Sequence, residues 1–274
     1  MDLGKSQAVK QQRKKLHIPS TVQADTLFNF MTELEYLTNI LKLKMVSPRY
    51  CIEDVRYLKL EGIKKLAFPM RCFCDINLHR LKEHLYWYGY YGIAFSKEWG
   101  MRAGIQPLQY VNEDSYLRKD YSLAFKSATK TKVVSNDIKQ MKSYLIYQLM
   151  YLKPYSGVFQ RRVNEGEKQK NTIKCFADEC EWRFVPDVTS IGYRQIYYKF
   201  ADVNSFTFNE INKSLEGNKK VSLAFEYSDI KYLIVKTRED FQRLLLEIEG
   251  ILSIEEQKDL ISKIIIWDES EGDF

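Results

Sequence analysis

Apolar residues follow one another along this chain at two spacings, one typical of helices and the other typical of strands. They share a helical face over 34–41 and again over 78–88, just before Gly89. Further helices are predicted over 136–152 and from residues 207, 237 and 253, and a short helix or turn over 97–104. The predicted strands span 27–31, 72–76, 90–96, 107–111, 175–187, 221–227, 229–235 and 263–267.

Four of the predicted helices begin with a capping-box spacing, in which a Ser or Thr is followed three residues later by an acidic residue. These pairs are Thr32–Glu35, Thr207–Glu210, Thr237–Asp240 and Ser253–Glu256. The polar segment 158–171 is predicted to be an exposed excursion, and residues 49–60 are too mixed in character to assign.

No linker rich in Pro, Gly or Ser and no internal repeat divides the chain, which predicts one α+β domain. We place this domain over 25–267 and leave open a C-terminal subdomain from about residue 200. A basic tail or arm, 1–24, precedes the domain, and an acidic tail, 268–274, follows it.

The composition limits which partners and which cellular compartment are expected for the protein. Lys and Arg outnumber Asp and Glu by 42 to 36, a mild excess that permits nucleic acid or an acidic protein as partner but requires neither. The five cysteines, without a signal peptide, favour reduced thiols in the cytoplasm. No apolar run approaches the roughly 20 residues of a membrane helix, so no membrane association is predicted.

The segment 72–110 concentrates residues that carry chemistry. His84 lies beside the aromatic run 86–88 and close to Asp75 in sequence, an arrangement suited to acid–base work or to hydrogen bonding a ligand. The alternative is a helix histidine bonded to a tyrosine or carbonyl. Gly89 and Gly92 flank two tyrosines and allow either a turn or the close approach of a ligand.

A second cluster occupies 179–185. In a strand, Glu179, Glu181 and Arg183 share one face, while Trp182 and Phe184 share the other. The charged face is either a surface salt bridge or a carboxylate that a guanidinium holds in a cleft, and the spacing leaves both interpretations open. The cysteines at 72, 74, 175 and 180 lack the usual spacing of structural zinc sites, so we predict no metal site.

Several blocks of the chain, in order over roughly residues 26–250, resemble the AbiGi-like family of bacterial abortive-infection proteins. They are LFNFMTELEYLTNILKLKMVSPRYCIED, CFCDINLHRLKEHLYWYGYYGIAFSKEWGMRAGIQPLQYV, YLKPYSG, ECEWRFVP and LAFEYSDIKYLIV. The resemblance implies a role in defence against bacteriophage. It also implies a protein partner, because such proteins are usually labelled antitoxins paired with a nucleotidyltransferase-like toxin.

The order of elements is also similar to ADP-ribosyltransferase-like domains, with a strand–helix opening, a central Tyr-Gly turn and a late strand carrying Glu-x-Arg. This resemblance implies NAD as the cofactor, Glu181 as the catalytic carboxylate, Arg183 orienting it, and His84 near the nicotinamide ribose. The residues expected around a ligand are Asn29, Asp75, Tyr88, Tyr91 and Gly92. Asn29 stands where such folds often place His or Arg, which favours a site that only binds.

Two hypotheses of function follow. In the first, the protein is an antitoxin or regulatory subunit that binds a partner or a nucleotide-like ligand in a cleft near His84, Tyr91 and Glu181. In the second, it is an ADP-ribosyltransferase-like effector that uses Glu181. A third hypothesis, RNA binding, rests on the mild basicity alone.

Overall fold

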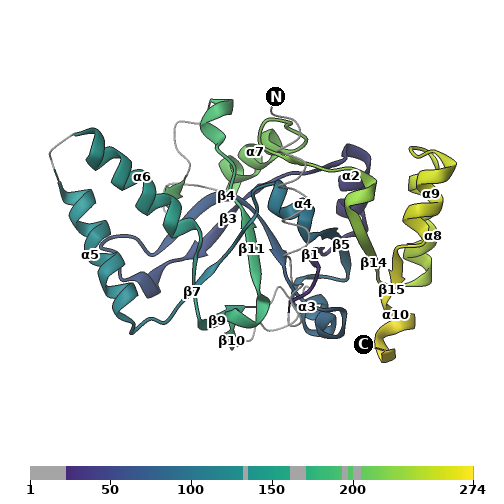
Figure 1. Ribbon diagram of the computed structural model, residues 1–274, viewed down its shortest axis with the longest axis horizontal. Helices are drawn as coiled ribbons and strands as arrows, with labels where there is room; N and C mark the ends of the chain where they lie inside the picture. Colours follow the sequence, from purple (N-terminus) through teal and green to yellow (C-terminus); the bar gives the residue numbers. More distant parts are fainter. Residues whose placement is uncertain (1–22, 132–134, 161–170, 193–196, 200–204, 274) are drawn as a thin grey trace, which may run out of the picture.

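A computed structural model describes residues 23–131, 135–160, 171–192, 197–199 and 205–273. A mixed sheet of nine strands runs through the molecule and helices cover both of its faces, so the chain is a single α+β domain (Figure 1). The α5–α6 hairpin lies at one end of the molecule, and α8 and α9 lie at the other. Most of the predicted basic arm falls outside the described residues.

Strand β4 is the longest in the sheet and pairs with four others. Along its main path the sheet has the order β15 (Ile264–Ile266), β14 (Ile230–Val235), β5 (Tyr91–Ser96), β1 (Thr26–Met31), β4 (Lys65–Cys74), β11 (Glu181–Phe184) and β6 (Gln106–Pro107). β3 (Arg49–Asp54) and β12 (Tyr198–Lys199) also pair with β4. Because β14 and β15 extend this same sheet, residues beyond 200 share its core.

Within the described residues, three pairs of strands lie outside the main sheet. They are β9 (Ser156–Gln160) with β10 (Asn171–Cys175), β2 (Met45–Val46) with β13 (Leu223–Ala224), and β7 (Gln109–Val111) with β8 (Leu152–Pro154). The first of these pairs occupies part of the segment predicted to be an exposed excursion, and residues 161–170 of that segment lie outside the described part of the chain.

Several helices are found in the described part of the chain. They are α2 (Leu34–Leu43), α3 (Leu81–Tyr88), α4 (Lys97–Arg102), α5 (Tyr116–Lys130), α6 (Asn136–Met150), α7 (Ser205–Leu215), α8 (Arg238–Glu249), α9 (Ile254–Ile261) and α10 (Trp267–Ser270). The predicted capping boxes form at the starts of α8 and α9. The predictions at Thr32 and Thr207 are wrong, because Glu33 is the N-terminal cap of α2 and α7 already begins at Ser205.

Alternation along the central strands divides the core between the two faces of the sheet. Leu27 of β1 packs with α2, α4 and α8, whereas the next residue, Phe28, packs with α3. The same division separates Leu233 from Ile234 on β14. A further apolar cluster joins α5 and α6 to β4. Successive side chains of one strand therefore lie on opposite faces of the sheet, and the residues of the predicted site are divided between these two faces.

Gly89 fixes the position of α3 over the sheet. Its amide donates to the carbonyl of Leu85 and ends the helix, and its φ of 113° is one that other residues rarely adopt. A Cβ at this position would lie 2.1 Å from the carbonyl oxygen of Met31, at the end of β1. The helix that carries His84 and Tyr88 is thus anchored directly against the central strand.

Candidate functional site

A buried network of charged side chains lies on the α3 face of the sheet. Glu181 is its centre: Lys153 Nζ lies 2.5 Å from Oε2, and Arg183 Nη2 lies 2.8 Å from Oε1. Lys153 Nζ also lies 2.6 Å from Glu179 Oε2, and Lys174 Nζ lies 2.8 Å from Glu179 Oε1. The two carboxylates therefore alternate with three cations.

Strand register explains how these groups meet. β11 pairs with β4 so that Glu181 and Arg183 lie opposite Cys74 and Cys72, on the same face of the sheet. The amide of Glu181 donates to the hydroxyl of Tyr110 at 2.8 Å, which fixes the start of the strand. The lysines come from β8 and β10, so the network joins segments that are distant in sequence.

Arg183 is held from three sides. Its Nη1 donates to the carbonyl of Met150 at 2.6 Å, its Nη2 lies 3.6 Å from Glu53 Oε2, and its guanidinium lies 5.6 Å from the centre of the Phe68 ring. With Glu53, the network balances three cations against three carboxylates. Such a balance is what a buried set of charges needs to be stable.

The burial of Glu181 corrects both interpretations of the charged strand face. Its side chain is 4% exposed and that of Arg183 is 1% exposed, so the pair is not a surface salt bridge. Glu181 also does not point into a cleft, because both of its oxygens face cations inside the protein. Of the two glutamates, Glu179 lines a cavity and Glu181 does not, although both oxygens of Glu179 also face lysines.

The charges set the ionisation of the buried groups. Burial alone would raise the pKa of Glu181, but Arg183 and Lys153 outweigh it and lower the pKa to about 2. Burial raises the pKa of the Cys72 and Cys74 thiols, and the neighbouring carboxylates raise it further. Among the described residues, no group of three or more His, Cys, Asp or Glu side chains is placed to hold a metal ion.

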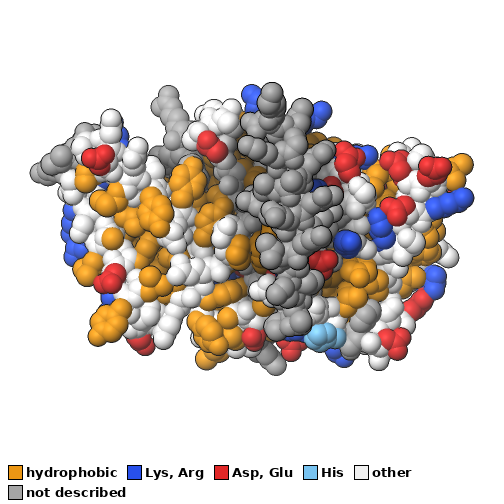
Figure 2. All heavy atoms as spheres, in the orientation of Figure 1, with side chains coloured by type: hydrophobic (Ala, Val, Ile, Leu, Met, Phe, Trp, Pro, Cys, Tyr) orange, Lys and Arg blue, Asp and Glu red, His pale blue; other side chains and the backbone are white. Residues whose placement is uncertain are grey.

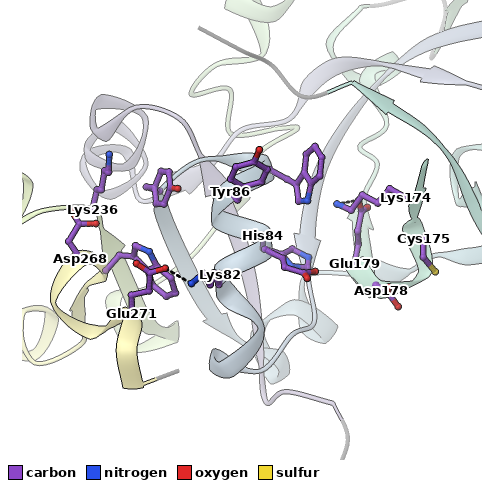
Figure 3. Close-up of a pocket in the computed structure, with 14 residues that line it drawn as sticks. Lys82, His84, Tyr86, Lys174, Cys175, Asp178, Glu179, Lys236, Asp268 and Glu271 are labelled. Carbon is purple, nitrogen blue, oxygen red and sulfur yellow. Dashed lines mark ion pairs between the residues drawn. The ribbon is translucent and has the colours of Figure 1, made fainter. Parts of the chain in front are cut away.

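A cavity of about 580 Å³ adjoins this network around α3 (Figure 3). Figure 3 shows Lys174, Cys175, Asp178 and Glu179 on one side of the helix and Lys236, Asp268 and Glu271 on the other. Aromatic side chains, namely Tyr86, Trp87, Tyr90 and Trp267, complete the lining. Two of its lysines are neutralised, because Lys174 pairs with Glu179 and Lys82 lies 2.8 Å from Glu271.

His84 enters this cavity from α3 and is 5% exposed. One ring nitrogen bonds to the backbone of Arg80, and the other, Nε2, has no hydrogen-bond partner among the described residues. Burial, followed by the nearby charge of Lys174, lowers the pKa of His84 to about 4. The imidazole is therefore neutral at neutral pH, and the hypothesis of a ligand-bonding histidine remains a prediction.

The buried imidazole makes stability depend on pH. Because the folded pKa of about 4 lies below the ordinary 6.5, the unfolded chain takes up the proton first as the pH falls. We expect His84 to account for about 2 kcal/mol of lost stability between pH 7 and pH 5. Urea unfolding at both pH values measures it, and the His84→Gln variant should lose that component. An equal pH dependence in both proteins would contradict the prediction.

The other predicted ligand residues are only partly brought together. Tyr88 joins the network, donating its hydroxyl to Glu179 and accepting from Lys174 at 3.2 Å. Asp75 instead pairs with Lys97 of α4, whose Nζ lies 2.7 Å from Oδ2. These two contacts lie on different elements, so no cleft shared by Tyr88 and Asp75 follows from the geometry.

Three further predicted residues lie apart from the network. The Asn29 amide is buried between β1 and β4, where Nδ2 donates to the Cys72 carbonyl at 2.8 Å. The Tyr91 hydroxyl donates to Asp240 of α8 at 3.2 Å. Gly92 packs against Phe30 inside the sheet. The structure does not bring His84, Tyr91 and Glu181 to one cavity, since of these three residues only His84 lines the cavity around α3.

The α5–α6 hairpin exposes a second candidate surface. It carries six large apolar or tyrosine side chains with exposed fractions of 37–81%, which we call the α5–α6 surface: Tyr116, Leu117, Leu123, Met141, Tyr144 and Tyr147. Figure 2 shows hydrophobic side chains gathered on the visible face over these two helices. Tyrosine and methionine are enriched where proteins bind one another, so the hairpin is a candidate interface.

The family model described as "Putative abortive phage resistance protein AbiGi, antitoxin" matches residues 44–236, well over half of the chain. The chain belongs to the AbiGi family of abortive phage resistance proteins. An abortive phage resistance protein AbiGi of Lactococcus lactis subsp. cremoris is 31% identical over 245 residues, covering 83% of this chain and 98% of the relative. No solved structure matches.

The AbiGi match can be mapped onto the fold. It includes β4, α3, β11 and the α5–α6 hairpin, and thus the charge network and the α5–α6 surface. The C-terminal wall of the cavity around α3, which Trp267 and Asp268 form, lies beyond the matched residues. No helix in the described part of this AbiGi member is long and apolar enough to cross a membrane.

Proposed function

We propose that this AbiGi member acts in abortive infection as an antitoxin that binds a protein partner through the α5–α6 surface. The observation that carries the proposal is the exposure of that surface, where Tyr144 is 64% exposed and Leu123 is 63% exposed. Exposed apolar side chains that gather on one element of a soluble protein commonly mark an interface. The family description, which includes the word antitoxin, supports a protein toxin as the partner.

Charge around this surface indicates what the partner looks like. The hairpin carries exposed lysines at 119, 126, 130 and 139, of which Lys126 and Lys130 pair with Glu61, against exposed acidic residues at 120 and 137. A partner that fits would present an apolar centre rimmed by carboxylates, because opposite charges at the rim favour encounter and register. Nucleic acid, the weaker hypothesis from the sequence, would need these same lysines but not the apolar side chains.

The proposal predicts that Met141→Glu/Tyr144→Glu abolishes neutralisation of a nucleotidyltransferase-like toxin. Two central interface side chains commonly contribute a few kcal/mol of binding, so we expect at least about a hundredfold weaker capture of the toxin. The measurement is growth of bacteria that co-express both proteins, together with co-purification. Leu246→Glu, at an apolar position of α8 that is 71% exposed, is the matched control and should leave neutralisation unchanged.

The same experiment separates the alternatives. Full neutralisation by the Met141→Glu/Tyr144→Glu variant would exclude this surface as the binding site. The ADP-ribosyltransferase-like hypothesis has less support from the geometry, because Glu181 is surrounded by cations within the protein. Expression of the chain alone should leave cell growth and intracellular NAD unchanged, and a fall in NAD that Glu181→Gln prevents would favour the effector.

A further inference from the structure

Two arginines on neighbouring strands of the sheet differ in their surroundings: Arg183 is buried, whereas Arg71 is half-buried and lines a cavity. Arg183 of β11 faces the carboxylates of Glu181 and Glu53. Arg71 of β4 lies opposite Phe184, two positions before Phe73, which belongs to the core on the other face. No carboxylate of the described residues lies within ion-pair distance of Arg71. The sheet thus holds one compensated and one uncompensated guanidinium.

Asn29 holds Arg71 in place. β1 and β4 pair at Phe28 and Cys74, and beyond this point the Asn29 side chain bridges the two strands. Its Nδ2 donates to the carbonyl of Cys72 at 2.8 Å, which turns Oδ1 towards Arg71. Arg71 Nε donates to that oxygen at 3.1 Å, and Nη2 donates to it as well. A neutral amide therefore orients the guanidinium without neutralising it.

The electrostatic environment of Arg71 is unfavourable. Burial lowers the pKa of Arg71 to about 10, and the nearby charge of Arg49 acts in the same direction. The group is still protonated at neutral pH, and even a half-buried charge without a counter-ion is less stable than one paired with a carboxylate. An anion that reached Arg71 would replace the missing carboxylate and gain charge-assisted hydrogen bonds from a preoriented guanidinium.

Arg71 opens into a cavity of about 610 Å³, which lies between α2, α7 and the start of β3. Its lining includes the aromatic residues Phe30, Tyr36 and Tyr88 and the asparagines Asn39, Asn209 and Asn212. Glu210 and Glu216 also line it, and Glu210 Oε1 lies 3.0 Å from Lys213 Nζ. Cavities of this size commonly hold a small organic ligand.

We propose that this cavity binds a small phosphorylated molecule of the mononucleotide class, with Arg71 as the ligand of its phosphate. Guanidinium matches the geometry of a phosphate oxygen pair, and Tyr36, which is 47% exposed, offers a ring on which a base can stack. The exposed residues Asn39 and Asn209 offer amide donors and acceptors for the edge of the base. The cavity around α3 is a poorer anion site, because five carboxylate residues line it against three lysines, and two of these, Lys82 and Lys174, already have carboxylate partners. This ligand site is independent of the α5–α6 surface.

Calorimetric titration of the full chain with AMP, GMP, CMP and UMP, with the matching nucleosides and with inorganic phosphate tests the proposal. We expect at least one mononucleotide to bind, and its nucleoside and inorganic phosphate to bind at least tenfold more weakly. The Arg71→Met variant should bind that nucleotide at least thirtyfold more weakly, while Lys82→Met, at the cavity around α3, should bind it as the wild type does.

A second variant keeps the result interpretable if Arg71→Met does not fold. Asn29→Asp places a carboxylate where Arg71 now meets an amide, so it should supply the missing counter-ion and weaken nucleotide binding without removing the arginine. Millimolar nucleotides that give no heat with the wild type would overturn the proposal, as would wild-type affinity in Arg71→Met or in Asn29→Asp. Equal affinity for inorganic phosphate and for every mononucleotide would overturn the nucleotide class.

Discussion

Glu181→Ala is expected to destabilise the protein by about 3–5 kcal/mol, because it leaves Lys153 and Arg183 buried without their shared counter-ion. Both oxygens of the carboxylate face a cation at 2.8 Å or less, and the side chain is 4% exposed. For a chain of this length such a loss corresponds to a fall of about 10 °C in the melting temperature. Thermal and urea unfolding measure it directly.

Glu247→Ala serves as the control for this change. Glu247 pairs with Lys42 on the surface, where its side chain is 46% exposed, and exposed pairs contribute about 1 kcal/mol at most.

Lowering the pH should reproduce part of the destabilisation caused by Glu181→Ala. Since the folded pKa of about 2 lies below the ordinary 4.5, the stabilisation is complete above about pH 4.5 and is lost as the pH falls towards 2. A Glu181→Ala protein as stable as the Glu247→Ala control would contradict the buried network.

Gly89→Ala should be at least as damaging, with a loss of about 4 kcal/mol or more. The backbone at Gly89 has φ 113° and ψ 159°, a region that is essentially restricted to glycine and costs a side chain about 1–3 kcal/mol. The new Cβ would also lie 2.1 Å from the Met31 carbonyl oxygen, so α3 would have to move away from β1. Unfolding measured by circular dichroism in urea quantifies the loss.

Gly104→Ala separates the two contributions to the Gly89 effect. Gly104 also has a positive φ, of 74°, but a Cβ there would meet no atom within 4 Å. The Gly104→Ala substitution should therefore lower the free energy of unfolding only by the conformational strain at a positive φ, about 1 kcal/mol. Similar losses in the two variants would mean that the contact between Gly89 and Met31 does not fix the position of α3.

Local patterns in the sequence predicted the elements that local interactions determine. Both confirmed capping boxes, at Thr237 and Ser253, need only residues within one turn of the helix. Helix α5 was missed, because its inner face includes Arg118, whose Nε donates to the carbonyl of Glu113 at 2.6 Å, along with a few apolar residues. A helix whose buried face is partly polar gives little apolar periodicity to detect.

The candidate site was predictable only in part for a similar reason. The shared face of Glu181 and Arg183 followed from alternation, but its burial depends on Lys153, which comes from another strand. No spacing in the chain links residue 153 to residue 181. Likewise, Arg71 resembles any other basic residue until the fold shows that no described carboxylate accompanies it. Long-range charge pairing is decided by topology, which the sequence pattern leaves open.

The strand order of the central sheet also affects how the protein is made. β5 lies between β1 and β14, so its two neighbours are translated at very different times. On the ribosome, β1 and β5 are present long before β14, and the edge of β5 that pairs with β14 has no partner during that interval. Unpaired apolar edges recruit other chains. The yield of folded protein therefore depends on how quickly β14 follows or on a chaperone that shields β5 meanwhile.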